Sequence, residues 1–561
     1  MVTVTQLHRD DHDFVPGTIK VFNTSDDGSI SSGSLKKNKN GVILVPQPTE
    51  SPNDPLNWGV TRKMWHFFVV CFITGLTAAT SNDAGAAQDS LNEIYGISYD
   101  SMNTGAGVLF LFIGWSCIFF APASSLYGRR ITYLICLLAG ALGCVWFAVS
   151  KTTSDTIWSQ AFVGMGEACA EAQVQQSLAD IFFQHQLGSV LTVYILATSV
   201  GSFLGPLIAQ FISDSQTFRW VGWWGAIITG ATLVAVFFTC EETVFDRSAH
   251  SHIYESVEAS PEPEFQNDKL KNTVSVSNFG SEKENTSSEN FNDNEAQGSK
   301  EKPKPYWKRI AVITPSPYLE GFGFKQYVMR FVVYFKIFTL PAVWLSGLLW
   351  GLQDAYMSFF LTTEDDYFPE APWNYSETGV AIMNVATLVG AAIGCCFAGF
   401  CSDWHVLWLS KRNNGILEPE FRLWLLFATL IISPAGLIMF GVGAARMWPP
   451  WVIYGGLGLI GFGWGSIGDT AMSYMMDAYP ETIIQGMVGV SIINNSLGSI
   501  FTFVCSYWLE SSGTQNTYIA LAVIDFATIA LIIPFLIWGK QLRRWTKNRY
   551  LGLVEMSQGM G

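Results

Sequence analysis

Apolar residues occur in runs of about twenty along most of the chain, which is the length a helix needs to cross a bilayer. Polar or Gly- and Pro-containing segments separate these runs. Twelve spans are predicted, at 65–86, 103–125, 131–150, 157–181, 188–212, 220–240, 341–361, 378–402, 421–443, 452–476, 486–509 and 518–538. The pattern predicts an all-α membrane protein with twelve transmembrane helices in two six-helix halves.

A long polar interval after the sixth span divides the chain. The sequence predicts a cytoplasmic tail over 1–63, an N-terminal half over 64–241, a central loop over 242–336, a C-terminal half over 337–540 and a tail over 541–561. Residues 241–300 hold 13 acidic and 5 basic residues with many Ser and Asn, a composition typical of disorder. Residues 301–336 mix basic and aromatic side chains, and we expect interfacial helices there.

Composition agrees with a membrane protein, because 49% of the 561 residues are hydrophobic and only 14% are charged. Soluble proteins carry about 25% charged residues. The net charge of −14 comes largely from the acidic loop, so it does not indicate a basic partner, and we expect no nucleic acid. The ten cysteines lie in or beside apolar spans without metal-ligand spacing, so we expect packing roles, no metal and no cofactor.

Basic residues near the span ends set the expected orientation. Arg62, the Arg129–Arg130 pair, the basic part of the central loop and Lys540 all fall on one side if twelve spans are present. Both termini and the central loop should then be cytoplasmic. We expect the protein itself to lie in the plasma membrane. Asn374 begins an Asn-Tyr-Ser sequon on the opposite side and is a candidate glycosylation site.

The fourth predicted span, 157–181, carries acids where lipid-compatible residues are expected. If it is a helix, Gln160, Glu167, Glu171 and Gln175 form one polar stripe. A carboxylate at bilayer depth costs at least ~2.5 kcal/mol, and two together repel each other unless a proton or cation neutralises them. The stripe therefore predicts a site for a positive charge.

Several motifs resemble known transporters. Gly201, Gly205 and Pro206 form a GxxxGP sequence like that of the drug/proton-antiporter branch of the major facilitator superfamily. Its glycines also suit close helix packing without a transport role. Longer stretches, including SPNDPLNW at 51–58 and FFQHQLGSVLTVYI at 182–195, resemble the yeast polyamine (histidinol) permeases. Gly128, Arg129, Arg130 and Asp403 resemble the superfamily's conformational loop motif, although Ser125 stands where an Asp is usual, so an ion pair is not expected in that loop.

The resemblance implies that the first, fourth, seventh and tenth spans line a central cavity. No Lys or Arg occurs in these four spans. Spaced carboxylates with aromatic walls suit a linear polyamine. The expected substrate-binding residues are Asp83, Glu167, Glu171, Asp354, Trp350, Tyr356, Asp469 and Tyr474, and the proton-coupling candidates are Glu167, Glu171 and Asp477.

Other acids have plainer interpretations. Asp89 suits an outer loop, Asp180 a structural role at a membrane boundary, and Asp477 a gate or a terminal charge. Asp525 lies outside the expected cavity.

The resemblance implies a monomeric importer of spermidine, putrescine and related cations such as histidinol, coupled to protons and embedded in membrane lipid. Two alternatives stay open: a drug/proton antiporter that exports hydrophobic cations, and a transport-inactive nutrient sensor that signals through the acidic loop. An enzyme is not expected, because the sequence has no nucleophile–base, metal or phosphate-loop motif.

Overall fold

The computed structural model describes residues 14–20, 36, 44–245, 247, 302–316, 319 and 321–558. The acidic segment 248–300, including the proposed signalling part of the central loop, lies outside the described residues.

The N-terminal half contains six long helical segments. Its elements are η1 (Pro55–Asn57), α2 (Val60–Ser81), η2 (Ala84–Ala87), α3 (Gln88–Tyr95), α4 (Tyr99–Tyr127), α5 (Arg129–Ala148), α6 (Thr153–Cys169), η3 (Ala170–Val174), α7 (Gln175–Ile181), α8 (Gln184–Ser215) and α9 (Phe218–Thr239). The segment α6–η3–α7 corresponds to the predicted fourth span, with a π-helical turn at η3.

The C-terminal half repeats this arrangement after two shorter helices, α10 (Tyr306–Arg309) and α11 (Phe324–Lys336). Its further elements are η5 (Ile337–Thr339), α12 (Pro341–Tyr367), α13 (Glu377–Cys396), η6 (Phe397–Cys401), α14 (Ser402–Arg412), β2 (Ile416–Leu417), η7 (Pro419–Leu425), α15 (Leu426–Ala445), α16 (Pro450–Ala478), η8 (Pro480–Thr482), α17 (Ile483–Ser512), α18 (Thr514–Ile529) and α19 (Ile532–Gln558).

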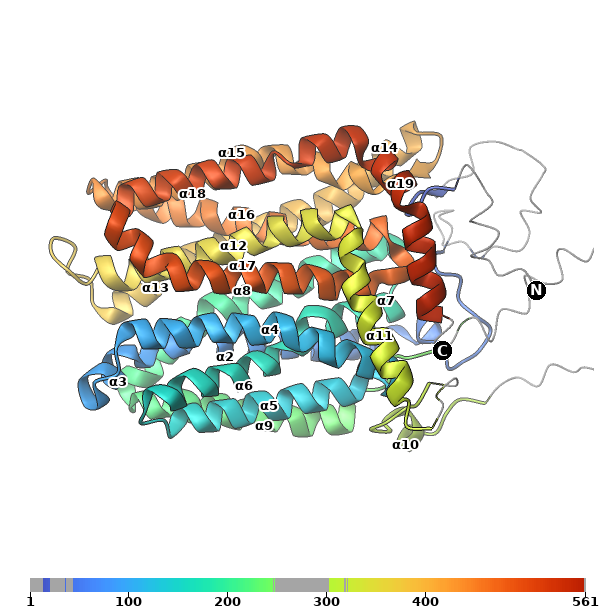
Figure 1. Cartoon of the computed structure of the whole chain (residues 1–561), viewed down its shortest axis with the longest axis horizontal. Helices are drawn as coiled ribbons and strands as arrows, with labels where there is room; N and C mark the ends of the chain where they lie inside the picture. Colours follow the sequence, from blue (N-terminus) through green and yellow to red (C-terminus); the bar gives the residue numbers. More distant parts are fainter. Residues whose placement is uncertain are drawn as a thin grey trace, which may run out of the picture.

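The long helices of the two halves lie side by side in one bundle (Figure 1). Helix α4 packs against α17, and α8 packs against α13, so these two pairs join the halves. Nine of the described helices are long and apolar enough to cross a membrane, or ten if the bent pair α11–α12 counts as one span. The all-α membrane fold is thus confirmed. The count of twelve is reached only by adding α6–α7 and α16, which carry the polar residues of the bundle interior.

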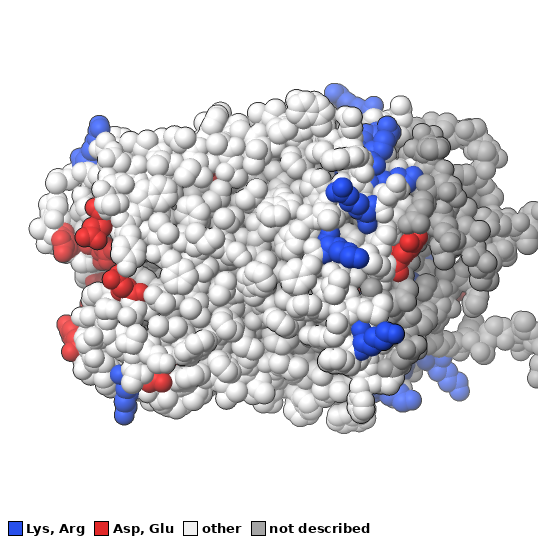
Figure 2. All heavy atoms as spheres, in the orientation of Figure 1, with Lys and Arg blue, Asp and Glu red and all other residues white. Residues whose placement is uncertain are grey.

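The two ends of the bundle differ in charge (Figure 2). Most Lys and Arg side chains on the visible face gather at the end where α11 and α19 lie, and Asp and Glu dominate the opposite end, near α3 and α13. We call these the basic end and the acidic end. This asymmetry is the one that the spacing of charges along the sequence predicts.

The beginning and the end of the chain meet at the basic end. Strand β1 (Ile19–Lys20) pairs antiparallel with β2. Arg543 of α19 donates to both carboxylate oxygens of Glu420, at 2.8 and 2.7 Å, and to the carbonyl of Pro16. Both Arg543 and Glu420 are buried, so the predicted tail after residue 540 continues as a docked helix.

Candidate functional site: an acid cluster between the halves

Three acidic side chains from both halves lie close together. They are Glu167 of α6, Glu171 of η3 and Asp354 of α12, and their carboxylates are near enough to act on one another electrostatically. We call them the central acid cluster. None of the three forms an ion pair with a Lys or Arg among the described residues. Uncompensated carboxylates in a low dielectric favour a bound proton or cation.

The π-helical turn η3 sets the position of Glu171. Such a turn inserts an extra residue into an α-helix and is frequent at functional sites. Glu167 in the regular helix before it is 8% exposed, whereas Glu171 is only partly buried. Glu171 interacts with the side chain of Ser491 from α17, across the interface between the halves. The sequence reveals the two acids but not the irregular turn.

Aromatic rings line one side of the cluster. The Trp464 indole N–H donates to Asp354 Oδ1 at 3.0 Å. The ring centroids of Trp464 and Trp350 are 4.6 Å apart, and Phe203 of the other half meets Trp464 edge-on at 5.6 Å. An ammonium group over such rings gains about 0.5–2 kcal/mol. Trp350, one of the predicted binding residues, thus packs in this wall together with Trp464 and Phe203.

Asp83 lies within the first candidate membrane span, Val60–Tyr95, but at a break between two helices rather than inside a continuous helix. Helix α2 ends at Ser81, and Asp83 is the residue before the 3₁₀ turn η2 at the acidic end. The apolar run continues through Ala84–Ala87, so hydropathy alone cannot locate the end of the helix.

Two further predicted binding residues lie elsewhere. Asp469 accepts from Thr192 Oγ1 of α8 at 2.9 Å, and the charges that act on it are those of Arg422 and Asp403. Tyr474 packs edge-on against Phe535 of α19, with ring centroids 6.4 Å apart. The structure thus does not bring Asp469 or Tyr474 to the central acid cluster.

Tyr356 lies next to Asp525 rather than beside the cluster. Its ring is 1% exposed, and its hydroxyl has no hydrogen-bond partner in the described part of the chain. Asp525 accepts from Gln353 Nε2 at 2.9 Å. Tyr356 and Asp525 form a separate buried polar group, apart from the central acid cluster.

Asp477 is held in an ion pair that sequence reasoning missed. Arg422 of η7 donates from Nε to Asp477 Oδ2 at 2.5 Å and from Nη1 to Asp403 Oδ1 at 3.0 Å. Asp403 Oδ2 also accepts from the Ser189 backbone N–H at 2.9 Å and from Ser189 Oγ at 2.8 Å. Asp477 therefore has a built-in basic partner and belongs to a latch between the halves, which we define as Asp403, Arg422, Asp477 and Ser189.

The corresponding loop of the N-terminal half has its own charge contacts. The backbone N–H groups of Arg129 and Arg130 donate to the Glu242 carboxylate at 3.0 and 3.1 Å. Gly128 has φ +106°, and a Cβ there would meet Glu242 Oε2. Arg129 also pairs with Asp180 at 3.3 Å, so this loop has an ion pair that the missing Asp at Ser125 led us not to expect.

Close packing accounts for the GxxxGP sequence in α8. A Cβ on Gly201 would come within 2.2 Å of the Gly75 carbonyl, and one on Gly205 within 2.8 Å of Ala79 Cα. Both glycines let α8 lie against α2. Pro206 lies within the same helix, which continues to Ser215.

Contacts between the halves occur at both ends of the bundle. The latch closes one side of the basic end. At the acidic end Gln210 Nε2 donates to Glu377 Oε2 at 2.7 Å, and Thr378 Oγ1 donates to Asp214 Oδ2 at 2.9 Å. The central acid cluster lies between these two sets of contacts.

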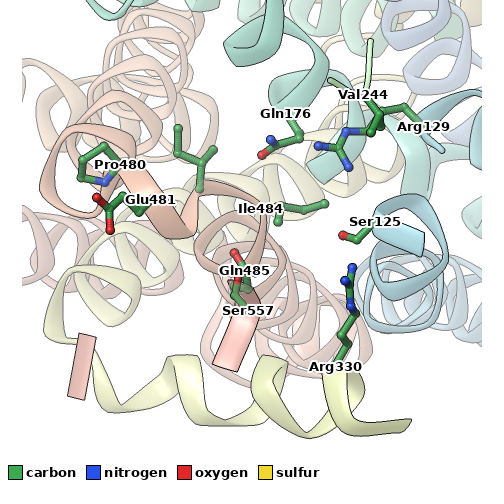
Figure 3. A pocket seen from close by; sticks show the side chains of 11 residues that line it. Ser125, Arg129, Gln176, Val244, Arg330, Pro480, Glu481, Ile484, Gln485 and Ser557 are labelled. Atoms are coloured by element: carbon green, nitrogen blue, oxygen red, sulfur yellow. Dashed lines mark hydrogen bonds between the residues drawn. The ribbon is translucent and has the colours of Figure 1, made fainter. Parts of the chain in front are cut away.

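On the other side of the basic end the halves leave a cavity of about 240 Å³ (Figure 3). Arg129 and Gln176 approach it from the N-terminal half, Arg330 from α11, and Gln485 and Ser557 from the C-terminal half. The full lining is Ser125, Arg129, Gln176, Val244, Arg330, Pro480, Glu481, Ile483, Ile484, Gln485 and Ser557. The basic end therefore holds both the latch and a cavity between the halves.

Comparison with known proteins identifies the family. Residues 67–503 match the Major Facilitator Superfamily. The chain belongs to this superfamily. It is similar to Protein HOL1 of Saccharomyces cerevisiae, with 53% identity over 581 residues, covering 99% of each chain. It is 48% identical to an uncharacterized MFS-type transporter of Schizosaccharomyces pombe, over 96% of this chain and 94% of that one.

Other matches agree with this assignment. Weaker sequence matches carry the names of a multidrug transporter and a probable drug/proton antiporter. The proton:xylose symporter XylE, at 11% identity, gives a TM-score of 0.56 over 85% of this chain and 97% of that one, which supports the fold alone. As a superfamily member, the protein is a multi-pass membrane transporter of small molecules.

Proposed function

We propose that the protein imports polyamines, such as spermidine and putrescine, and related organic cations such as histidinol. The central acid cluster is the observation that carries this proposal. It offers three carboxylates and an aromatic wall, and no described Lys or Arg pairs with it. A polyamine supplies several ammonium groups on an apolar stem, which matches both features.

Alternating access gives the mechanism. With the acidic end open, the carboxylates of Glu167, Glu171 and Asp354 take up the cation from outside. The halves then close at the acidic end through the Gln210–Glu377 contact, and the latch at the basic end opens to release the cation.

The membrane potential supplies much of the driving force. Each positive charge moving inward gains about 2.3 kcal/mol per 100 mV of inside-negative potential, so a trivalent cation gains about 7. Proton coupling adds to this gradient, and one carboxylate of the Glu167–Glu171 pair is a candidate carrier because the two act on each other.

The proposal places the protein in the plasma membrane as a monomer, with the basic end in the cytoplasm. The excess of Lys and Arg at that end supports this orientation (Figure 2). Asn374, exposed in the loop after α12, would then face outward, where glycosylation occurs.

Drug/proton antiport is the second candidate function, favoured by the weaker matches to proteins with that name. The direction of transport separates the two. Cells that express an importer accumulate labelled spermidine, whereas an exporter lowers the spermidine content of preloaded cells.

Neutralising the cluster tests the site itself. Glu167→Gln, Glu171→Gln and Asp354→Asn should each lower spermidine uptake at least tenfold at equal surface expression. Asp89→Asn is the matched control, since Asp89 is an exposed acid of α3 that accepts from Tyr99 at 2.7 Å. Wild-type uptake in all three cluster variants would refute the proposed site.

A further inference from the structure

A second set of buried acids lies behind α12, away from the central acid cluster. Residues 353, 360 and 364 share one face of the helix, and Asp354 points about 100° away from it. Asp525 of α18 meets this face at Gln353, and Glu364 lies on it about 16 Å farther toward the acidic end. Neither acid belongs to the cation site described above.

Both acids have carboxylate oxygens without a partner. Glu364 is fully buried, and neither of its oxygens has a hydrogen-bond partner within the described ranges. Asp525 is 1% exposed, and its Oδ2 is likewise unpartnered there. The ion pairs of the described residues include neither acid. A carboxylate in such a place is stable only with a bound proton or another positive charge.

Hydroxyl groups surround the two acids. Ser433 of α15 interacts with Asp525, and Tyr356 lies between the two acids along α12. Around Glu364 are Tyr454 of α16, Tyr518 of α18 and the neighbouring Asp365. The Tyr518 hydroxyl donates to Thr363 Oγ1 at 2.9 Å. The two acids thus lie among hydroxyl and carboxyl groups, which are able to exchange protons.

The two buried acids, Glu364 and Asp525, lie between the acidic end of the bundle and the central acid cluster. Asp365, next to Glu364, is exposed at the acidic end. At the inner end, Gln353 contacts Asp525 and precedes Asp354 in α12. A Cβ on Gly463 of α16 would lie 2.5 Å from Ser433 Oγ and 3.4 Å from Gln353 Oε1, so α16 packs tightly against both side chains. If α12 shifts when a cation binds Asp354, the contact between Gln353 and Asp525 should therefore change.

We propose that Asp525 and Glu364 form a proton-binding column in the C-terminal half, and that Asp525 carries the coupled proton. A proton enters from the acidic end by way of Glu364, protonates the Asp525 carboxylate, and leaves on the other side after the halves rearrange. This inference rests on the proposed function but assigns the coupled proton to Asp525 in place of the Glu167–Glu171 pair, which then only binds the cation.

Reconstituted protein in liposomes separates the two roles. Counterflow of labelled spermidine without a pH gradient measures cation binding and the conformational cycle. Spermidine uptake driven by an imposed inward proton gradient, with a trapped pH-sensitive dye, measures coupling. Asp525→Asn should keep counterflow within twofold of wild type and lose at least 90% of the stimulation by the gradient. Glu167→Gln should lose both activities.

Conservative variants guard against misfolding. Asp525→Glu retains a carboxylate and should keep most of the stimulation. Tyr356→Phe removes only a hydroxyl and should slow proton-driven uptake several-fold with counterflow intact. If the proton gradient stimulates uptake by Asp525→Asn fully, the proposed proton column is refuted but the proposed import is not. Wild-type counterflow without any stimulation would also overturn it, and absent wild-type counterflow would refute the proposed import itself.

Discussion

Replacing Asp403 with alanine should open the basic end. Asp403 makes the shortest contacts of the latch between the halves, because it accepts from the Ser189 backbone and hydroxyl of α8 at 2.9 and 2.8 Å and also accepts from Arg422, whereas Gln184 of α8 reaches Asp477 only at 3.5 Å. In the variant, Arg422 keeps its partner Asp477, so the C-terminal half should stay folded. The change therefore acts mainly on the contact between the halves.

The expected size follows from the two bonds to Ser189, at 2.9 and 2.8 Å. A hydrogen bond to a charged group contributes about 1.5–3 kcal/mol. Losing both costs the closed arrangement about 3–6 kcal/mol, which shifts the equilibrium between closed and open basic ends at least about 100-fold. Ser189→Ala keeps the backbone bond and should give about half of this free-energy change.

Spin labels on exposed positions of α8 and α14, such as Gln186 and Lys411, would report the opening as a longer distance. The exposed cysteines Cys396 and Cys401 must first be replaced. An unchanged distance distribution in Asp403→Ala, with Ser189→Ala also unchanged, would show that the latch does not hold the halves together.

Three further predictions concern packing and charge. Gly205→Leu should abolish surface expression, because even a Cβ there overlaps α2, whereas Gly205→Ala should retain part of it; equal expression of Leu and wild type would contradict the packing. Arg543→Ala should lower the melting temperature of the purified protein, because it leaves Glu420 buried without its partner at a cost of about 3–5 kcal/mol. In a double-mutant cycle, adding Glu420→Gln to Arg543→Ala should recover part of the lost stability. Trp464→Phe should raise the KM for spermidine several-fold with little change in expression, because it keeps a ring but removes the hydrogen bond to Asp354; an unchanged KM would exclude this bond from the site.

Much of the fold follows from the sequence because the bilayer imposes it. Apolar runs give the helices, and Lys and Arg mark one end. Glu167, Glu171 and Asp354 were identifiable because acids in an apolar helix are costly, and the structure shows that Asp354 from the other half lies near the two glutamates.

The features that the sequence did not predict depend on contacts between residues far apart in the chain or on irregular backbone. Arg422 lies 55 positions from Asp477, and nothing in the local pattern indicates that the two meet. The π-helical turn at Glu171 has an ordinary helical sequence. Tyr474 belongs to the expected helix but faces α19, because helical periodicity gives a face and not the partner of that face.

Gly17 lies against the end of α16 at the basic end. A Cβ on Gly17, which has φ +72°, would lie 2.4 Å from the Asp477 carbonyl, and Arg543 holds the adjoining Pro16 carbonyl. Any movement that opens the basic end must therefore carry residues 16–20 along with the C-terminal half. Removing residues 14–20 would take away the contacts that this segment makes with α16, α19 and β2.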